Sequence, residues 1–418
     1  MVFTAFTVLW YPESGVGVPA FAAWGKLSNV FFGTFEHWDA DYFLQVARYG
    51  YDSRSAAYMP AFPGLVHAGA WVTRSVLVAG VLIAFAAAIA GIAYVCRITR
   101  DLLGGEVAYD TAILLALYPV ALVFTAPYSE GLFLFASAGS LYYGTRGRFW
   151  LAGLLAGLAC ATRITGLAVV PALLLLAWPA VRRHGPLVLA PVLGLPLAAM
   201  VAVAAYYQHA VGDSLAFVHA KGQWGRHVLA LGPLQGAWMS AKAAYHGVVH
   251  LASAPSDFTI TSLAAENTID FVVLVAAVAL TVVVFRRLGA AWGVFSAGII
   301  AIATAAPVTD GGEVLQSLPR YVMVDFPLFI AGASMLQGGT TRRGFVFGGC
   351  SQCRPGNGNY GALTLEEIFA DHIKPLGVPA WSGAMIGHGQ PQWTVAEGAE
   401  VEIDSSAGTI QLLESPVV

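Results

Sequence analysis

Long apolar runs separated by short polar connections cover most of this chain. Each run approaches the length, about 20 residues, at which a helix crosses a bilayer. Only helices and closed barrels satisfy the backbone in lipid, and the runs lack the alternation of barrel strands. The pattern therefore predicts an all-α polytopic membrane protein with about nine to eleven helices. The runs are 75–96, 107–124, 128–144, 150–180, 186–207, 266–285, 289–306 and 319–337, with further apolar segments at 59–73 and 232–252.

Composition strengthens the membrane interpretation. Hydrophobic residues make up 57% of the chain and charged residues 11%, whereas about a quarter of the residues in soluble domains are charged. The net charge is −3 and no long run of Lys or Arg occurs, which argues against a nucleic-acid partner. Four cysteines, two of them in apolar runs, do not describe a disulfide framework.

The first residues, MVFTAFTVLWYPE, carry no basic region and no small-residue cleavage site. They therefore do not resemble a signal peptide. The segment is also shorter than a full membrane span. We expect either a short first helix or a natural start upstream of Met1.

Basic residues orient the helices, because cytoplasmic connections carry an excess of Lys and Arg. Five arginine pairs fall in alternate connections, which predicts that these connections and the C-terminal tail are cytoplasmic. We expect a multi-pass protein of the inner cell membrane. The opposite connections hold the reactive-looking side chains, which predicts a site on the outer face, although solvated loops attract polar residues in any case. The pairs are Arg97 and Arg100, Arg146 and Arg148, Arg182 and Arg183, Arg286 and Arg287, and Arg342 and Arg343; the opposite set is Asp39, Asp41, Ser129, Glu130, Asp213, Asp310, Glu313 and Arg320.

The sequence becomes polar and Gly-rich from Gly344 onward. There TLEEIFADHI predicts a short amphipathic helix, and EVEIDSSAGTIQLLE predicts two strands around a turn. We therefore expect a membrane domain over 1–338 and a small α/β soluble fragment over 344–418. A fragment of this size is near the lower limit for building its own core.

The stretch HWDADYF places Asp39 and Asp41 beside an apolar region. Sugar transfer from a lipid phosphate to an alcohol needs a base for the hydroxyl and a cation for the departing phosphate. Two neighbouring carboxylates would raise the proton affinity of one of them, which suits a base. In the alternative interpretation Trp38, Tyr42 and Tyr49 form an interfacial aromatic belt and the aspartates face water.

Three further charged positions are candidates for a functional role. Arg163 interrupts an apolar run, where a charge usually faces a polar cavity, or else reaches the interface between two half-length helices. Glu130 lies at the start of the apolar run 128–144, where its carboxylate could instead interact with the helix dipole. Arg320 and Tyr321 stand at the outer end of the last run, where they suit a phosphate or a membrane anchor.

Two signals in the tail are weak. Cys350 and Cys353 have metal-ligand spacing, but a zinc site would need distant His372 or His388. The glycines around His388 could present it as a base, yet no serine partner is evident nearby. The residues thus define no metal site and no certain cofactor, and assistance by a divalent ion stays open.

In order along the chain, four segments closely resemble the bacterial relatives of PIG-V mannosyltransferases, of the GT-C class of polytopic glycosyltransferases. The resemblance covers about 35–335 and implies a GT-C-like fold. It also implies inverting transfer of a sugar, mannose in characterised members, from a polyprenyl-phosphate donor to a lipid- or protein-linked acceptor on the outer face. The segments are WDADYFLQVARYGY, FTAPYSEGLFLFASAGSLYYGTRGRFWLAGLLAGLACATRITGL, GDSLAFVHAKGQWGR and LPRYVMVDFPLF.

The resemblance also implies roles for individual residues. Its WD element makes Asp39 the preferred base, with Asp41 next. The WD element and three others also imply substrate contacts. These contacts fall on Trp38 (WD), on Tyr128, Ser129 and Glu130 (YSE), on Thr162 and Arg163 (TR), and on Arg320 and Tyr321 (RY).

The tail from GFVFGG to QLLE is similar to the C-terminal end of LD-carboxypeptidases, serine peptidases that trim murein tetrapeptides. His388 matches their catalytic histidine, but their nucleophilic serine and glutamate have no counterpart here. A histidine without its nucleophile cannot perform acyl transfer. We expect a chimera in which a truncated transferase precedes an inert peptidase fragment.

Two other functions stay open at this point. A transporter or flippase would also place polar residues such as Arg163 inside helices. Transporters commonly carry inverted repeats, however, and no clear repeat is evident here. A membrane-tethered murein carboxypeptidase is suggested by the tail alone.

Overall fold

The computed structural model describes residues 21–36, 38–253 and 258–336, together with strands at 345–348, 380–384, 401–404 and 409–412. The chain divides into two compact units, Met1–Ser334 and Met335–Val418. The predicted helix at TLEEIFADHI and the residues Cys350, Cys353, His372 and His388 lie outside the described residues.

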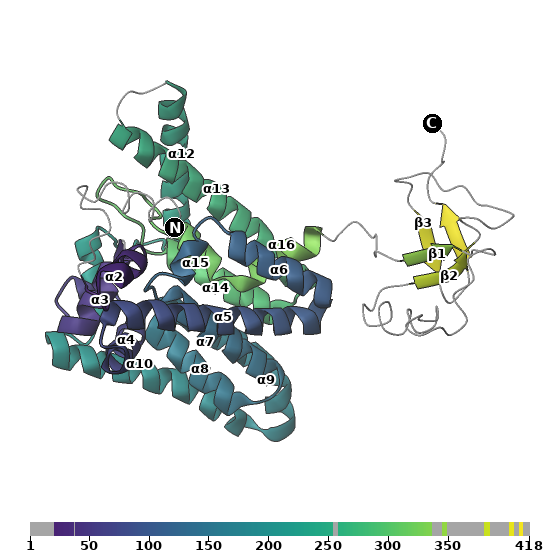
Figure 1. Ribbon diagram of the computed structural model, residues 1–418, viewed down its shortest axis with the longest axis horizontal. Helices are drawn as coiled ribbons and strands as arrows, with labels where there is room; N and C mark the ends of the chain where they lie inside the picture. Colours follow the sequence, from purple (N-terminus) through teal and green to yellow (C-terminus); the bar gives the residue numbers. More distant parts are fainter. Residues whose placement is uncertain are drawn as a thin grey trace. The chain divides into compact units, whose positions relative to one another are not determined.

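The described part of the first unit is built from helices (Figure 1). This confirms the all-α polytopic prediction. In chain order the α-helices are α2 (Lys26–Gly33), α3 (Asp39–Tyr49), α4 (Ala61–Thr73), α5 (Val76–Leu103), α6 (Gly105–Leu117), α7 (Glu130–Thr145), α8 (Phe149–Thr162), α9 (Val169–His184), α10 (Leu189–Val211), α11 (Ala216–His219), α12 (Pro233–Ala252), α13 (Phe258–Arg287), α14 (Ala290–Thr304), α15 (Leu318–Met323) and α16 (Phe326–Leu336). Short 3₁₀ turns connect them: η2 (Ser55–Ala57), η3 (Ala121–Phe124), η4 (Ile164–Ala168), η5 (Pro186–Val188) and η6 (Ala220–Trp224).

Four helical segments in the described part of the chain are long and apolar enough to cross a membrane. They are Val76–Leu103, Ile164–His184, Pro186–Val211 and Thr259–Arg287. Shorter apolar helices occur at Phe149–Thr162, Ala290–Thr304 and Phe326–Leu336. The number of crossings, nine to eleven, therefore stays a prediction.

Two predicted runs are broken in the structure. The run expected at 107–124 ends as helix α6 at Leu117, because Tyr118 takes an extended conformation (ψ 137°) in front of Pro119. The run expected at 319–337 divides into α15 and α16 on either side of Val324 and Asp325. A proline in the first turn of a helix costs no hydrogen bond, and Pro327 occupies such a position in α16.

Small residues bring helices into close contact. A Cβ atom at Gly153 of α8 would lie 2.1 Å from the carbonyl oxygen of Pro191, and one at Gly157 would lie 3.1 Å from that of Leu195, both on α10. This spacing of small residues allows backbones to approach, as is common between membrane helices. The α8–α10 crossing thus fixes the end of α8, from which Arg163 emerges.

Apolar side chains fill the inside of the bundle and also cover parts of its outside. Phe133 of α7, Phe295 of α14 and Phe326 of α16 are fully buried. On α13, by contrast, Val272 is 61% exposed and Val275 is 52% exposed. Large apolar side chains exposed along a helix are expected where the helix contacts lipid.

Contacts link several of the arginine-bearing helix ends. Arg146, in the connection after α7, forms an ion pair of 2.9 Å with Asp101 near the end of α5. Arg287, at the end of α13, donates to the carbonyl oxygen of Ser334 in α16 at 2.8 Å. These contacts agree with the expectation that the arginine-bearing connections lie at one end of the bundle. The cytoplasmic placement of these connections stays a prediction.

The second unit contains two strand pairs. Strands β1 (Phe345–Gly348) and β2 (Ala380–Ala384) are parallel, with Phe345 opposite Ala380. Strands β3 (Val401–Asp404) and β4 (Thr409–Leu412) are antiparallel, with Val401 opposite Leu412. Both strands of the second pair lie within EVEIDSSAGTIQLLE, where two strands were predicted.

Candidate active site

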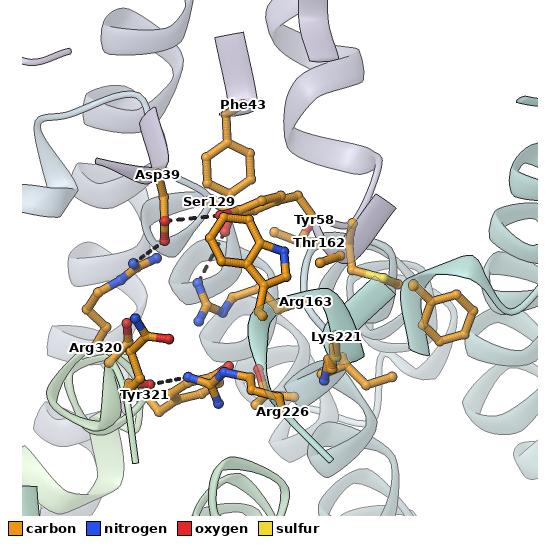
Figure 2. Close-up of a pocket in the computed structure, with 18 residues that line it drawn as sticks. Asp39, Phe43, Tyr58, Ser129, Thr162, Arg163, Lys221, Arg226, Arg320 and Tyr321 are labelled. Atoms are coloured by element: carbon orange, nitrogen blue, oxygen red, sulfur yellow. Dashed lines mark hydrogen bonds and ion pairs between the residues drawn. The ribbon is translucent and has the colours of Figure 1, made fainter. Parts of the chain in front are cut away.

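A cavity of about 150 Å³ lies where several segments meet that are far apart in sequence (Figure 2). These segments are α3, the η2 turn, the break between α8 and η4, the connection between α10 and α12, and α15. Polar and charged side chains dominate the lining, which is unusual in a chain this apolar. The lining residues are Asp39, Phe43, Ala57, Tyr58, Met59, Ser129, Thr162, Arg163, Ile164, Thr165, Phe217, Lys221, Trp224, Arg226, Gln316, Ser317, Arg320 and Tyr321.

Asp39 is the first residue of α3 and is held on three sides. Its backbone N–H donates to the Tyr128 hydroxyl at 3.1 Å. Its carboxylate oxygen Oδ1 accepts a hydrogen bond of 3.0 Å from Tyr58, and Oδ2 pairs with Arg320 (Figure 2). The side chain retains 26% exposure. Asp39 is therefore fixed in orientation yet accessible from the cavity.

Trp38 and Asp41 lie beside Asp39 in sequence but do not line the cavity. Trp38 has a positive φ of 56° and its side chain is 70% exposed. Asp41 is exposed two positions further along α3, and helical residues two apart do not face each other. The structure therefore brings one of the two predicted carboxylates into the cavity, and the expected mutual repulsion within one site has no geometric support.

Glu130 joins two arginines. Its oxygen Oε1 lies 2.7 Å from Arg163 Nη1, 2.8 Å from Arg320 Nε and 2.7 Å from Arg320 Nη2. Glu130 is fully buried, whereas Arg163 and Arg320 keep 12% and 16% exposure and line the cavity. Arg320 also contacts Asp39, so charges of alternating sign run from Arg163 to Asp39.

Arg163 occupies the break between helices rather than a helix interior. Its backbone is extended (φ −151°, ψ 145°) between α8 and η4. Its guanidinium donates to Ser129 Oγ at 3.2 Å and lies 5.0 Å from the centre of the Tyr321 ring. The charge in the middle of an apolar run is thus explained by an internal ion pair and a cavity, not by a path to the bilayer surface.

Lys221 and Arg226 also line the cavity, and sequence reasoning gave them no role. Burial lowers the pKa of Lys221, and the neighbouring cations Arg226 and Arg163 lower it further, while Tyr321 opposes them. Arg226 donates to the carbonyl oxygens of Ala306, at 3.5 Å, and Gln316. The sequence offered one signal for them. Both lie in a connection that is predicted to face outward, whereas most of the residues singled out in such connections are acidic.

The described residues contain no group of three or more His, Cys, Asp or Glu side chains that could hold a metal ion. The cavity itself carries one carboxylate, Asp39, among several cations. Such a lining suits an anion.

Residues 17–177 match the family model described as mannosyltransferase (PIG-V). Residues 336–403 match that of the LD-carboxypeptidase C-terminal domain. Both predicted resemblances are confirmed. The PIG-V match contains Asp39, Tyr128, Ser129, Glu130 and Arg163, whereas Lys221, Arg226, Arg320 and Tyr321 lie beyond it.

Curated relatives agree with the first match. GPI alpha-1,6-mannosyltransferase 2 of Rattus norvegicus is 31% identical over 164 residues, covering 36% of this chain and 33% of the relative. The protein of the same name in Mus musculus is 31% identical over 157 residues, covering 34% and 31%. The chain thus matches about a third of the length of these relatives.

A solved structure, ArnT from Cupriavidus metallidurans in the apo state, aligns over 83% of both chains. The sequence identity is 15% and the TM-score is 0.31. A similarity this low supports no conclusion about the site.

Proposed function

We propose that this protein is a membrane glycosyltransferase that moves a sugar, mannose, from a polyprenyl-phosphate donor to a hydroxyl of a lipid- or protein-linked acceptor on the outer face. One observation carries the proposal. A carboxylate that is fixed in orientation, Asp39, faces the same cavity as Arg163, Lys221 and Arg226. These are the two components that the reaction needs, a base and a site for the departing phosphate.

In the proposed reaction the acceptor hydroxyl oxygen attacks the anomeric carbon of the donor sugar. The bond from that carbon to the phosphate oxygen breaks, and its electron pair leaves with the polyprenyl phosphate. Asp39 accepts the hydroxyl proton. Because Tyr58 and Arg320 hold both carboxylate oxygens, the base is oriented before the acceptor arrives.

The cations suit the leaving group. Arg320 already shares its charge with Asp39 and Glu130, and Arg163 shares that of Glu130. Lys221 and Arg226 add positive charge that no carboxylate ion pair within the described residues offsets. A phosphate gains negative charge as the sugar departs, so an excess of cations stabilises the transition state more than the ground state.

The comparisons support mannose as the sugar and a lipid-linked substrate. Relatives of this chain are named GPI alpha-1,6-mannosyltransferase 2, and the PIG-V match covers the Asp39 region. Four helices suited to cross a membrane support the setting. An inner-membrane location and a cytoplasmic tail belong to the proposal.

The test is transfer by the purified protein in proteoliposomes supplied with radiolabelled polyprenyl-phosphate mannose. We expect label in a lipid or protein acceptor. Asp39→Asn should lower transfer by about 10²- to 10⁴-fold, the usual range for loss of a general base. Asp41→Asn should retain most of the activity, because Asp41 does not line the cavity. Folded Asp39→Asn protein that transfers as well as wild type would exclude the assignment, and label that crosses the bilayer without transfer would favour a flippase.

The tail has a separate test. We propose that it is catalytically inert, since the match to LD-carboxypeptidases covers only their C-terminal domain. Incubation with murein tetrapeptide should release no D-alanine above background. Release that disappears in His388→Ala would overturn this part of the proposal.

A further inference from the structure

We propose that Glu130 is a positioning residue, which holds Arg163 and Arg320 in place and through Arg320 aims the Asp39 carboxylate. The inference rests on the proposed transfer reaction. It also reassigns Glu130 of the YSE element, from contact with substrate to support of the residues that make it.

The burial of Glu130 places it behind the site. Its side chain has 0% exposure and is not part of the cavity lining, so substrate cannot reach it. Oε1 accepts from both arginines, and Oε2 is buried without a hydrogen-bond partner within the described residues. A buried carboxylate is retained where opposite charges compensate it. Here both compensating charges are cavity residues.

Arg320 transmits the position of Glu130 to the base. Its Nε and Nη2 are bound to Glu130, and its Nη1 is bound to Asp39. The guanidinium is planar and rigid, so fixing one edge fixes the direction of the other. Glu130 therefore determines where the Arg320 Nη1 group meets Asp39.

The other two residues of the element act in the same way. Tyr128 accepts the backbone N–H of Asp39 at 3.1 Å, and its ring lies 4.8 Å below the Arg320 guanidinium. Ser129 accepts from Arg163 at 3.2 Å. All three consecutive side chains thus bind residues of the site, at the point where α7 begins.

Glu130→Gln tests the charge at nearly constant shape. We expect kcat to fall by about 10²-fold, the effect of a misplaced catalytic group, with the donor KM changed by less than about threefold. Glu106→Gln, at an exposed glutamate in the first turn of α6, is the matched control and should leave both kcat and the donor KM unchanged.

Two results would overturn the inference. A donor KM that rises strongly at constant kcat would show that Glu130 binds substrate. A kcat equal to that of wild type in folded Glu130→Gln protein would show that Glu130 does not position the base. If Glu130→Gln does not fold, Tyr128→Phe decides, because it removes only the hydroxyl that accepts the Asp39 N–H, and it should lower kcat more than it raises KM.

A measurement without turnover separates this inference from the proposed function. Thermal unfolding of Glu130→Gln, Arg320→Lys and the double variant forms a double-mutant cycle. We expect the two losses of melting temperature to be strongly non-additive. Additive losses would contradict the inference even in a protein that transfers no sugar, whereas absence of transfer by wild type would contradict the proposed function only.

Discussion

Tyr58 donates a hydrogen bond to Asp39, with 3.0 Å between its hydroxyl oxygen and Oδ1. Burial raises the pKa of Tyr58, and the nearby Asp39 carboxylate raises it further, so the phenol keeps its proton and remains a donor. A hydrogen bond to a charged group contributes about 1.5–3 kcal/mol. The bond therefore has enough strength to orient the proposed base.

Tyr58→Phe should lower kcat by about 10- to 100-fold, the change that such a hydrogen bond predicts. The ring contacts with Phe43 and Tyr42 would remain, so the variant should stay folded. Tyr49→Phe, at a tyrosine that is 75% exposed, is the control and should behave as wild type. Unchanged kcat in folded Tyr58→Phe protein would show that the bond does not orient the base.

The lowered pKa of Lys221 predicts that binding of the donor weakens at alkaline pH. Only the protonated lysine attracts a phosphate, and burial lowers its pKa, so the attraction is present at low pH and is lost as pH rises through the lowered value. Donor KM should therefore rise at an alkaline pH at which an exposed lysine would still be charged. In Lys221→Arg the cation persists, because guanidinium does not deprotonate, and the weakening at alkaline pH should vanish.

Lys221→Met should raise the donor KM at every pH at which the wild-type lysine is charged, by about 10-fold or more. Lys242→Met, at an exposed lysine of α12, provides the control. Equal KM values for Lys221→Met and wild type would remove Lys221 from the anion site.

Trp224 anchors the segment that carries Lys221 and Arg226. The Arg54 guanidinium lies 4.4 Å from the indole centre, and the indole N–H donates to the Arg54 carbonyl oxygen at 3.3 Å. Trp224→Ala should therefore increase hydrogen exchange in residues 213–232 and raise the donor KM, while Trp224→Phe should retain part of the contact. Trp238→Ala, at a tryptophan that is 71% exposed on α12, should change neither. Unaltered exchange in Trp224→Ala would show that other contacts hold the segment.

The sequence singled out several residues that line the cavity, because charge is rare in this chain. Asp39, Arg163 and Arg320 stood out against apolar surroundings, and all three line the cavity. Lys221 and Arg226 were missed, since a cation in a polar connection is ordinary and only the fold reveals that this connection reaches the cavity. Trp38 has a φ of 56° and an exposed side chain outside the cavity, and no sequence pattern announced either feature.

The sequence predicted the helices whose bounds follow from runs of apolar residues. It missed helix ends that depend on a single residue. The break at Arg163 agrees with the interpretation in which two half-length helices meet there, since the run 150–180 is longer than one span needs. The early end of α6 depended on Pro119, a signal that hydropathy averages away. Which helices touch could not be predicted, since contacts such as α8 with α10 depend on surface shape.

Gly153 offers a test of that shape. A side chain there would collide with the Pro191 backbone, where an added Cβ would lie 2.1 Å from the carbonyl oxygen, so Gly153→Leu must separate α8 from α10. Overpacking of this kind destabilises by about 1–3 kcal/mol, and the melting temperature should fall by several degrees. Gly194→Leu on α10 is the matched control, because an added Cβ there meets no atom within 4 Å. Since Arg163 follows α8 directly, Gly153→Leu should also reduce transfer below the melting transition. A loss of stability without loss of transfer would show that the crossing supports the fold but does not position Arg163.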